Sequence, residues 1–366
     1  MKVARVETIP VSLPLARPMK MSIATVATRD CLVVRVHSDE GQVGIGEAMA
    51  VPYFTGETLD GTRSAVERVL APAVSGQDPL NLNLLAARLS KALVGNPAAR
   101  CALDIALHDL AARVLGVPLH ALLGGALRDR IVATWHCGNM NPEEDATECA
   151  EAVARGFRQL KVKVGHADYR LDWAGLKAIR EAVGDDVRLL VDANQAWTAE
   201  NAIAFIRGAE RYGVELVEQP VSRHDVAGLA RVSAAVDPAV APDEGVFTAE
   251  DLAVYIRAGA TDAVLLKLLK AGGLHGARRL ATLAEASGVA VFLAAMPGES
   301  SLSAAAAIHL AATLPSLPYG TAIAPHYITR DVVAEPIRPV DGEFRLPQGP
   351  GLGTELDEAA LGACRI

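Results

Sequence analysis

Polar and apolar residues alternate over much of the first 55 positions. The alternation is clearest in residues 32–36 and 43–45, and Asp39-Glu40-Gly41 stands between these two runs. A period of two is typical of strands that bury one face, and a short turn with glycine joins antiparallel neighbours. The pattern predicts a small antiparallel sheet at the N-terminus.

Helical spacing replaces this alternation from Gly56 to Leu123. Apolar residues recur three and four positions apart, Asn96-Pro97 is a favourable helix start, and Gly116 followed by Pro118 is a favourable stop. Together with the preceding sheet, these helices predict an α+β domain over residues 1–125.

Beyond about Arg130, short apolar strands are separated by helical segments, and most of the strands end in a polar residue. The polar ends lie 24 to 29 positions apart, which is about the length of one strand, one helix and two loops. Eight such units close into a (β/α)8 barrel, an α/β fold whose chemistry lies at the carboxyl ends of its strands. The expected strands are residues 131–135, 160–164, 189–192, 216–218, 240–243, 263–267, 290–293 and a weaker one near Tyr319.

We place this barrel over residues 126–330. An open doubly wound sheet is the alternative fold, but the chain has neither G-x-G-x-x-G after the first strand nor a P-loop motif. The remaining residues, 331–366, are rich in proline and glycine, and we expect them to return to the N-terminal sheet.

Composition narrows the classes of partner. With 51% hydrophobic residues, a net charge of −8 and no cluster of basic residues, the chain is typical of a globular protein that binds neither nucleic acid nor an anionic membrane. The five cysteines are widely spaced and contain no C-x-x-C pair, which favours reduced thiols in a cytoplasm. No apolar run is long enough for a membrane span, and the alanine-rich residues 302–314 predict a buried helix. A small molecule is therefore the expected partner.

Three consecutive predicted strands end in a carboxylate: Asp192, Glu218 and Asp243. Neighbouring strand ends of a barrel lie about 5 Å apart, so the three groups are expected to converge on one point, where a cation must offset their charge. An all-oxygen ligand set suits Mg²⁺ or Mn²⁺. The alternative is that each acid caps the helix that follows its strand.

Lysines flank the three acids on both sides. Period-two alternation puts Lys161 and Lys163 on one side of the strand before the acids, and Lys267 ends the strand after them. Neighbouring cations and burial lower the pKa of a lysine, which allows it to act as a base near neutral pH. Exposed surface lysines are the alternative, and Lys270 in particular could solvate a loop.

Other polar residues give weaker signals. Asn194 shares a side with Asp192 by alternation and could support it or cap the next helix. His136 and His326 could reach the mouth of the barrel, although a structural role is the expectation for each. No G-x-S-x-G or H-E-x-x-H motif is present, which excludes the corresponding hydrolase classes.

The whole set of motifs resembles the enolase superfamily and, within it, the muconate lactonizing enzyme subgroup of the mandelate racemase/muconate lactonizing enzyme family. The resemblance covers nearly the whole chain. It is carried by Lys161-Val162-Lys163, Val191-Asp192-Ala193-Asn194, Glu218-Gln219-Pro220, Asp243-Glu244 and Lys267, with Gly44-Ile45-Gly46-Glu47, Leu122-Leu123-Gly124-Gly125 and Gly349-Pro350-Gly351-Leu352-Gly353 outside the barrel.

This resemblance implies an N-terminal capping domain, completed by the C-terminal tail, over a modified TIM barrel. It implies Mg²⁺, with Mn²⁺ as a substitute, on the three acids, and Lys163 and Lys267 on opposite faces of a small carboxylate substrate. It also implies loops that close over the substrate, at residues 17–28 and 49–54. The predicted supporting residues are Asn194 and Glu244, and the predicted substrate contacts are Met19, Met21, Tyr53, Phe54, Met296, Glu299 and Ala322.

Two departures bear on the reaction. The seventh strand carries no histidine, unlike mandelate racemase-like members, and Ala322 stands about where muconate cycloisomerases have a glutamate. The sequence thus predicts an isomerase that removes a proton α to a carboxylate and forms an enediolate, as a racemase, epimerase or cycloisomerase, and that acts as a homo-oligomer. A dehydratase, a Schiff-base aldolase and a barrel that binds without turnover are the alternatives.

Overall fold

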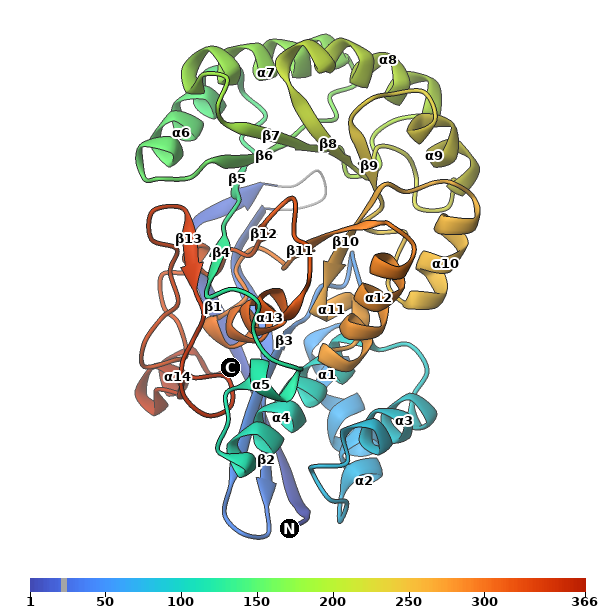
Figure 1. Cartoon of the computed structure of the whole chain (residues 1–366). Coiled ribbons are helices and arrows are strands. Elements are labelled where there is room, and N and C mark those ends of the chain that lie inside the picture. Colours follow the sequence, from blue (N-terminus) through green and yellow to red (C-terminus); the bar gives the residue numbers. More distant parts are fainter. Residues whose placement is uncertain (21–24) are drawn as a thin grey trace.

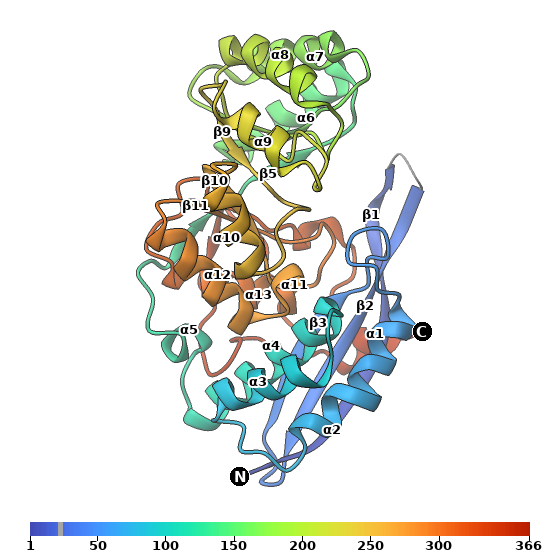
Figure 2. The same ribbon diagram turned by 90° about the vertical axis from the view of Figure 1, so that its right-hand side faces the viewer.

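The computed structural model describes residues 1–20 and 25–366. Its N-terminal part is an antiparallel sheet in the order β1-β2-β3, against which a layer of helices packs (Figure 2). The predicted α+β character of this part is confirmed. Its elements are β1 (Val3–Lys20), β2 (Thr25–Ser38), β3 (Val43–Met49), α1 (Leu59–Ala65), η1 (Val66–Leu70), α2 (Ala71–Val74), α3 (Leu82–Ala92), α4 (Pro97–Leu115) and α5 (Leu119–Leu122).

Helix α4 lies directly against β3 because two glycines leave no side chain between them. A Cβ on Gly44 would lie 2.2 Å from the carbonyl oxygen of Ala106, and one on Gly46 would lie 2.3 Å from that of Ala102. The helix begins at Pro97 and ends before Gly116, as predicted. Its first amides donate to the carboxylate of Glu57 rather than to the side chain of Asn96.

Strands β5 to β12 follow one another in parallel around the barrel (Figure 1). β9 joins β10 through Leu265 N, which donates to Pro242 O, and β12 joins the start of the barrel through Thr134 N, which donates to Thr321 O. The strands are β5 (Trp135–Cys137), β6 (Gln159–Lys163), β7 (Arg188–Asp192), β8 (Val214–Glu218), β9 (Ala239–Ala241), β10 (Ala263–Lys267), β11 (Ala290–Ala294) and β12 (Thr321–Ala322).

Helices cover the outer side of these strands. The alanine-rich helix α13 is buried along nearly its whole length, as its composition predicted. Among the helices of the described chain, none is both long and apolar enough to span a membrane. The helices are α6 (Pro142–Ala154), α7 (Tyr169–Val183), α8 (Ala199–Ala209), η2 (Glu210–Tyr212), α9 (Val226–Ser233), α10 (Ala249–Arg257), α11 (Leu268–Ala271), α12 (Leu274–Ala286), α13 (Ser301–Thr313) and η3 (Pro325–Tyr327).

The first predicted barrel strand, residues 131–135, was wrong at its start and right at its end, because Ala133 bridges Thr321 of β12 in parallel and Trp135 lies in β5. Residues Arg130–Val132 form β4, which pairs antiparallel with β13 (Glu343–Arg345) of the tail, and the barrel strand proper begins at Trp135. The tail then crosses to the N-terminal sheet, where α14 (Glu358–Cys364) packs on β1. Ile366 N donates to Pro10 O at the end of this path. The tail therefore ties the barrel to the sheet, whereas the boundaries at residues 125 and 330 stay predictions.

Candidate active site

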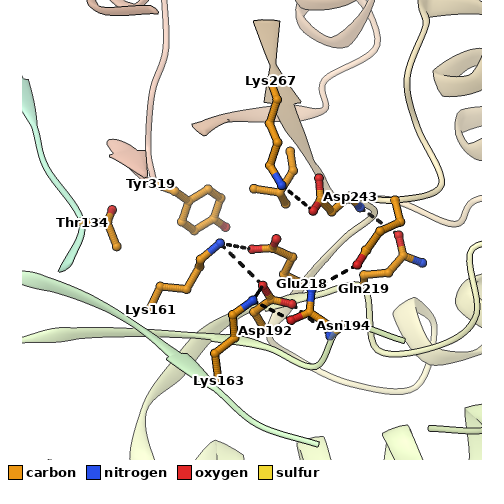
Figure 3. A network of polar contacts seen from close by, with 12 residues as sticks. Thr134, Lys161, Lys163, Asp192, Asn194, Glu218, Gln219, Asp243, Lys267 and Tyr319 are labelled. Atoms are coloured by element: carbon orange, nitrogen blue, oxygen red, sulfur yellow. Dashed lines mark hydrogen bonds and ion pairs between the residues drawn. The ribbon is translucent and has the colours of Figure 1, made fainter. Parts of the chain in front are cut away.

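The acids and one of the lysines stand side by side because parallel strands in register end at the same edge. Lys163 of β6 pairs with Asp192 of β7, which pairs with Glu218 of β8. Asp243 lies two residues beyond β9, whose last residue, Ala241, pairs with Glu218. Figure 3 shows Asp192 and Glu218 next to each other, with Asp243 further away beside Lys267, which approaches from a different strand.

Each carboxylate is paired with a lysine. Lys161 Nζ lies 2.7 Å from Glu218 Oε2 and 3.7 Å from Asp192 Oδ2, so that it bridges these two acids. Lys163 Nζ lies 2.5 Å from Asp192 Oδ2, and Lys267 Nζ lies 2.6 Å from Asp243 Oδ2. Lys161 and Lys163 both contact Asp192, which agrees with the prediction that they lie on one side of their strand.

The lysines differ in exposure, which matters for chemistry. The side chain of Lys163 is 39% exposed, whereas those of Lys161 and Lys267 are 6% and 7% exposed. Lys267 also lies under an aromatic ring of the N-terminal part, with its Nζ 4.8 Å from the centroid of Phe54. Lys163 is therefore open to solvent, whereas Lys267 is covered by this ring.

Burial and neighbouring charges shift the pKa of the acids in opposite directions. Burial, together with the nearby Asp192 carboxylate, raises the pKa of Glu218 to about 8. Burial also acts to raise the pKa of Asp243, but the ammonium groups of Lys267 and Lys270 outweigh it and hold that pKa well below its usual range. Against the effect of burial, Asp243 raises the pKa of Lys267 and Asp192 raises that of Lys163, so the lowered pKa expected for these lysines was wrong. In this arrangement the ammonium groups serve as counter-ions of the acids.

The expected convergence of the three acids on a single point is not found. Among the residues that the structure describes, no three His, Cys, Asp or Glu side chains are grouped as they would be around a metal ion, because lysine amines lie between or beside the carboxylates. The donor chemistry nevertheless fits a hard divalent cation. Glu218 Oε1 is buried and has no hydrogen-bond partner within the described chain, so one ligand oxygen is already available.

Asn194 and Glu244 extend the site beyond the acids. Asn194 Oδ1 accepts from Lys163 Nζ at 2.5 Å, and Asn194 Nδ2 donates to Glu244 Oε1 at 3.1 Å. The backbone of Asn194 turns into the left-handed region at φ 41°, and its amide donates to Asp192 Oδ1. This turn explains how one side chain just past β7 touches both Lys163 and Glu244.

Gln219 is a functional candidate that sequence reasoning missed. Its Oε1 accepts from the backbone amides of Asp243 and Gly245, at 2.9 and 3.2 Å, and its Nε2 donates to Val221 O. The side chain is completely buried. The sequence signal for Gln219 was its place directly after Glu218. Its side chain fixes the segment that carries Asp243.

Four substrate contacts were predicted in the N-terminal part, and the structure describes the side chains of two of them, Tyr53 and Phe54. The ring of Phe54 packs on Phe247 at 5.7 Å as well as on Lys267, so it lies at the site. Tyr53 is 44% exposed, and its hydroxyl accepts from Arg29 Nη1 at 3.2 Å. Met21 lies outside the described residues, and the side chain of Met19 is also outside them.

Arg29 was not singled out by sequence reasoning. It lies on β2, and its Nε donates to Pro297 O in the loop after β11. Together with its bond to Tyr53, this contact links three segments that are far apart in the sequence. An isolated arginine on an alternating strand gave no signal of this link.

The substrate contacts predicted near β11 and β12, which are Met296, Glu299 and Ala322, are buried. Met296 is 7% exposed, and its amide donates to Glu299 Oε1. Burial, followed by the nearby carboxylate of Glu47, raises the pKa of Glu299 to about 8. Ala322 is completely buried, so the end of β12 contributes an apolar side chain to a small interior cluster together with Leu190, Leu216, Ala241, Ala263, Leu265, Phe292 and Ala294.

Neither predicted histidine has the character of a base. Burial and the charges of Lys161 and Lys163 hold the pKa of His136 well below its usual range. His326 stacks on Trp135 at 5.0 Å and lines a surface cavity of about 670 Å³ together with α6 residues, away from the lysines. The structural role expected for His326 agrees with this position.

Comparisons with known proteins identify the family. Residues 3–124 match the model of the mandelate racemase/muconate lactonizing enzyme N-terminal domain, and residues 144–360 match the enolase C-terminal domain-like model. The L-Ala-D/L-Glu epimerase of Bacillus subtilis (strain 168) is 36% identical over 96% of both chains, and a chloromuconate cycloisomerase of Pseudomonas putida is 36% identical over 99% of this chain and 98% of its own.

A solved structure agrees with these relatives. The muconate lactonizing enzyme of Pseudomonas fluorescens, in complex with muconolactone, superposes with a TM-score of 0.95 at 32% identity and covers 100% of this chain and 99% of its own. This match confirms the predicted barrel with its capping domain. The chain belongs to the mandelate racemase/muconate lactonizing enzyme family of the enolase superfamily, and it is an isomerase of the muconate lactonizing enzyme subgroup.

Proposed function

We propose that this isomerase racemizes or epimerizes a small carboxylic acid by a two-base mechanism, with Lys163 and Lys267 as the bases. The observation that carries the proposal is the position of the two lysines. They come from β6 and β10, with the acids of β7, β8 and the β9 end between them (Figure 3). One lysine on each side of a flat intermediate is what inversion at carbon requires.

Asp192, Glu218 and Asp243 would hold Mg²⁺ or Mn²⁺. When bound, the cation supplies positive charge that stabilises the dianion formed as the substrate loses its α-proton. Lys161 adds a fixed positive charge from the same side, because its buried ammonium already bridges Asp192 and Glu218. Such preorganised charge acts where the new negative charge develops.

The proton transfers follow from the chemistry of an ammonium and an amine. Neutral Lys163 Nζ takes the α-proton from one face of the substrate, and the carbon is left as a planar enediolate. Protonated Lys267 Nζ then gives its proton to the opposite face, which inverts the centre. Reaction in the reverse direction exchanges the two roles, and each transfer contributes about 10²- to 10⁴-fold to the rate.

The surroundings of Lys163 and Lys267 support their roles as the two proton-transfer groups. Asn194 and Asp192 hold Lys163 in the exposed part of the site. Phe54, which packs on Phe247, shields Lys267 from water, and this strengthens the electrostatic interactions around the lysine. We place Tyr53, Met296 and Glu299 among the residues that shape the substrate pocket, together with Met19 and Met21.

Cycloisomerization is the second candidate, since the Pseudomonas putida relative is a chloromuconate cycloisomerase. It would use the same enediolate with a single lysine as acid. The apolar end of β12, with Ala322 buried, is the observation that favours the first candidate. A cytoplasmic location and a homo-oligomeric assembly stay predictions from the sequence.

Isotope exchange distinguishes the two candidates. Wild type, Lys163→Ala and Lys267→Ala are incubated in D₂O with L-Ala-L-Glu, with N-acyl amino acids and with chloromuconate, and NMR follows the α-proton and the products. A Lys177→Ala variant, which changes an exposed lysine, serves as control. Deuterium at the α-carbon with inversion, lost in each lysine variant but not in the control, supports racemization or epimerization. Lactone formation that survives in Lys267→Ala would instead establish cycloisomerization.

A further inference from the structure

Lys270 is one of the most completely buried charged residues of the barrel. It lies in α11, one turn beyond Lys267, and its side chain is 1% exposed. The sequence allowed it to be a solvated loop residue just before Ala271-Gly272-Gly273, and the structure shows that this alternative was wrong. A buried ammonium is costly unless it is paired and hydrogen-bonded, so its partners decide what it does.

The partners of Lys270 centre on Asp243. Its Nζ lies 2.7 Å from Asp243 Oδ1, 2.6 Å from Asp243 O and 2.8 Å from Leu265 O. These three acceptors match the three protons of an ammonium group. Lys270 therefore holds both the side chain and the backbone of Asp243 and ties them to β10.

Lys267 contacts the same carboxylate in a different way. It binds the other oxygen, Asp243 Oδ2, at 2.6 Å, and Phe54 of the capping part covers its Nζ. One carboxylate is thus shared between two ammonium groups, one oxygen each. Lys270 is fixed by three acceptors, whereas Lys267 makes one hydrogen bond to a group on the described chain.

We propose that Lys270 is a positioning residue that acts through Asp243: it is the permanent counter-ion of Oδ1, and it thereby keeps Oδ2 oriented toward the site and leaves Lys267 free to leave Asp243 and serve the substrate. This inference rests on the proposed function, in which Asp243 is a metal ligand and Lys267 is a base. It assigns a separate task to each of two lysines only three residues apart.

Binding of Mn²⁺ to the purified protein, measured by calorimetry and by the electron paramagnetic resonance signal of free Mn²⁺, tests the inference without any turnover. We expect Lys270→Met to raise the dissociation constant about 10- to 100-fold, as loss of a residue that orients a metal ligand does. Lys267→Met should bind Mn²⁺ within about threefold of wild type or more tightly, because it removes a competing cation. Lys177→Met, on an exposed helix face, is the matched control.

A double-mutant cycle separates action through Asp243 from a general structural role. In the Asp243→Asn background, adding Lys270→Met should change the Mn²⁺ dissociation constant by less than threefold. An equal loss in both backgrounds would overturn the inference. Wild-type affinity in a folded Lys270→Met variant would also overturn it.

Folding provides a second measurement. Asp243→Asn leaves the buried ammonium of Lys270 without its carboxylate, so we expect the double variant Asp243→Asn/Lys270→Met to melt at a higher temperature than Asp243→Asn alone. A double variant that is no more stable would refute the pairing. Failure of the wild type to bind Mn²⁺ would instead refute the proposed metal site itself, so the two failures are distinguishable.

Discussion

Replacement of Glu47 by glutamine should make the stability of the protein less sensitive to pH. Glu47 lies on β3, is completely buried, and joins the capping part to the start of α13 in the barrel. Its Oε1 accepts from Ser300 N at 2.9 Å and from Ser303 Oγ at 3.3 Å. Its Oε2 has no hydrogen-bond partner among the described residues.

The magnitude follows from the pKa of this carboxyl. Burial is the main cause that raises the pKa of Glu47 from 4.5 to about 7, with a smaller contribution from the carboxylate of Asp331, while Ser300 and Ser303 oppose the shift. Between these two pH values the folded protein holds a proton that the unfolded chain has released. The stabilisation is therefore fully present below about pH 4.5 and is lost as the pH rises through about 7, a loss of about 3 kcal/mol.

Urea unfolding at several pH values between 5 and 8 measures this loss. Wild type should become less stable over that range relative to Glu47→Gln, whose amide oxygen can still accept from Ser300 N but does not titrate. Part of the pH dependence should remain in the variant, because burial and Glu47 raise the pKa of Glu299 to about 8. Glu181→Gln on the exposed face of α7 is the control. Parallel stability curves for wild type and Glu47→Gln would refute the reasoning.

Three further outcomes follow from the structure. Dialysis against a chelator should abolish turnover and Mg²⁺ or Mn²⁺ should restore it, and an Asp192→Asn protein that keeps full activity without metal would exclude the proposed site. Asp109→Ala should cost about 3–6 kcal/mol in thermal unfolding, because it leaves the buried amides of Ile45 and Leu352 without an acceptor; a loss below 1 kcal/mol would contradict this. Phe54→Ala should slow proton transfer at Lys267 more than at Lys163, measured as unequal deuterium exchange of the two enantiomers, and equal effects would count against shielding by this ring.

The barrel and the order of its functional residues could be predicted because both depend on short-range patterns. Apolar runs that end in Asp192, Glu218 and Lys267 coincide with the ends of β7, β8 and β10. The start of the first strand was misplaced because Ile131, Val132 and Ala133 form one apolar run, and the partner of β4, β13, lies more than 200 positions further along the chain. Alternation within one segment carries no information about such a partner.

The pairing inside the site could not be predicted for a different reason. Spacing places Asp243 near Glu218, but Asp243 lies past the end of β9, and its orientation depends on Gln219 and Lys270. These contacts are made by long side chains whose rotamers no sequence pattern fixes. The same holds for Arg29, whose partners Tyr53 and Pro297 belong to two other segments.

The balance of charge at the site connects its structure to its chemistry. Four ammonium groups, on Lys161, Lys163, Lys267 and Lys270, face the carboxyl groups of Asp192, Glu218, Asp243 and Glu244, so the fully ionised set is neutral. A divalent cation and a monocarboxylate substrate together add one positive charge. Loss of one proton from one lysine restores neutrality, and burial makes a neutral site the favourable one. Against the effect of burial, Asp192 and Asp243 raise the pKa of Lys163 and Lys267, so a cation that took over these carboxylates would favour release of one proton. The proposed mechanism assigns this loss to Lys163, which is the most exposed of the four lysines.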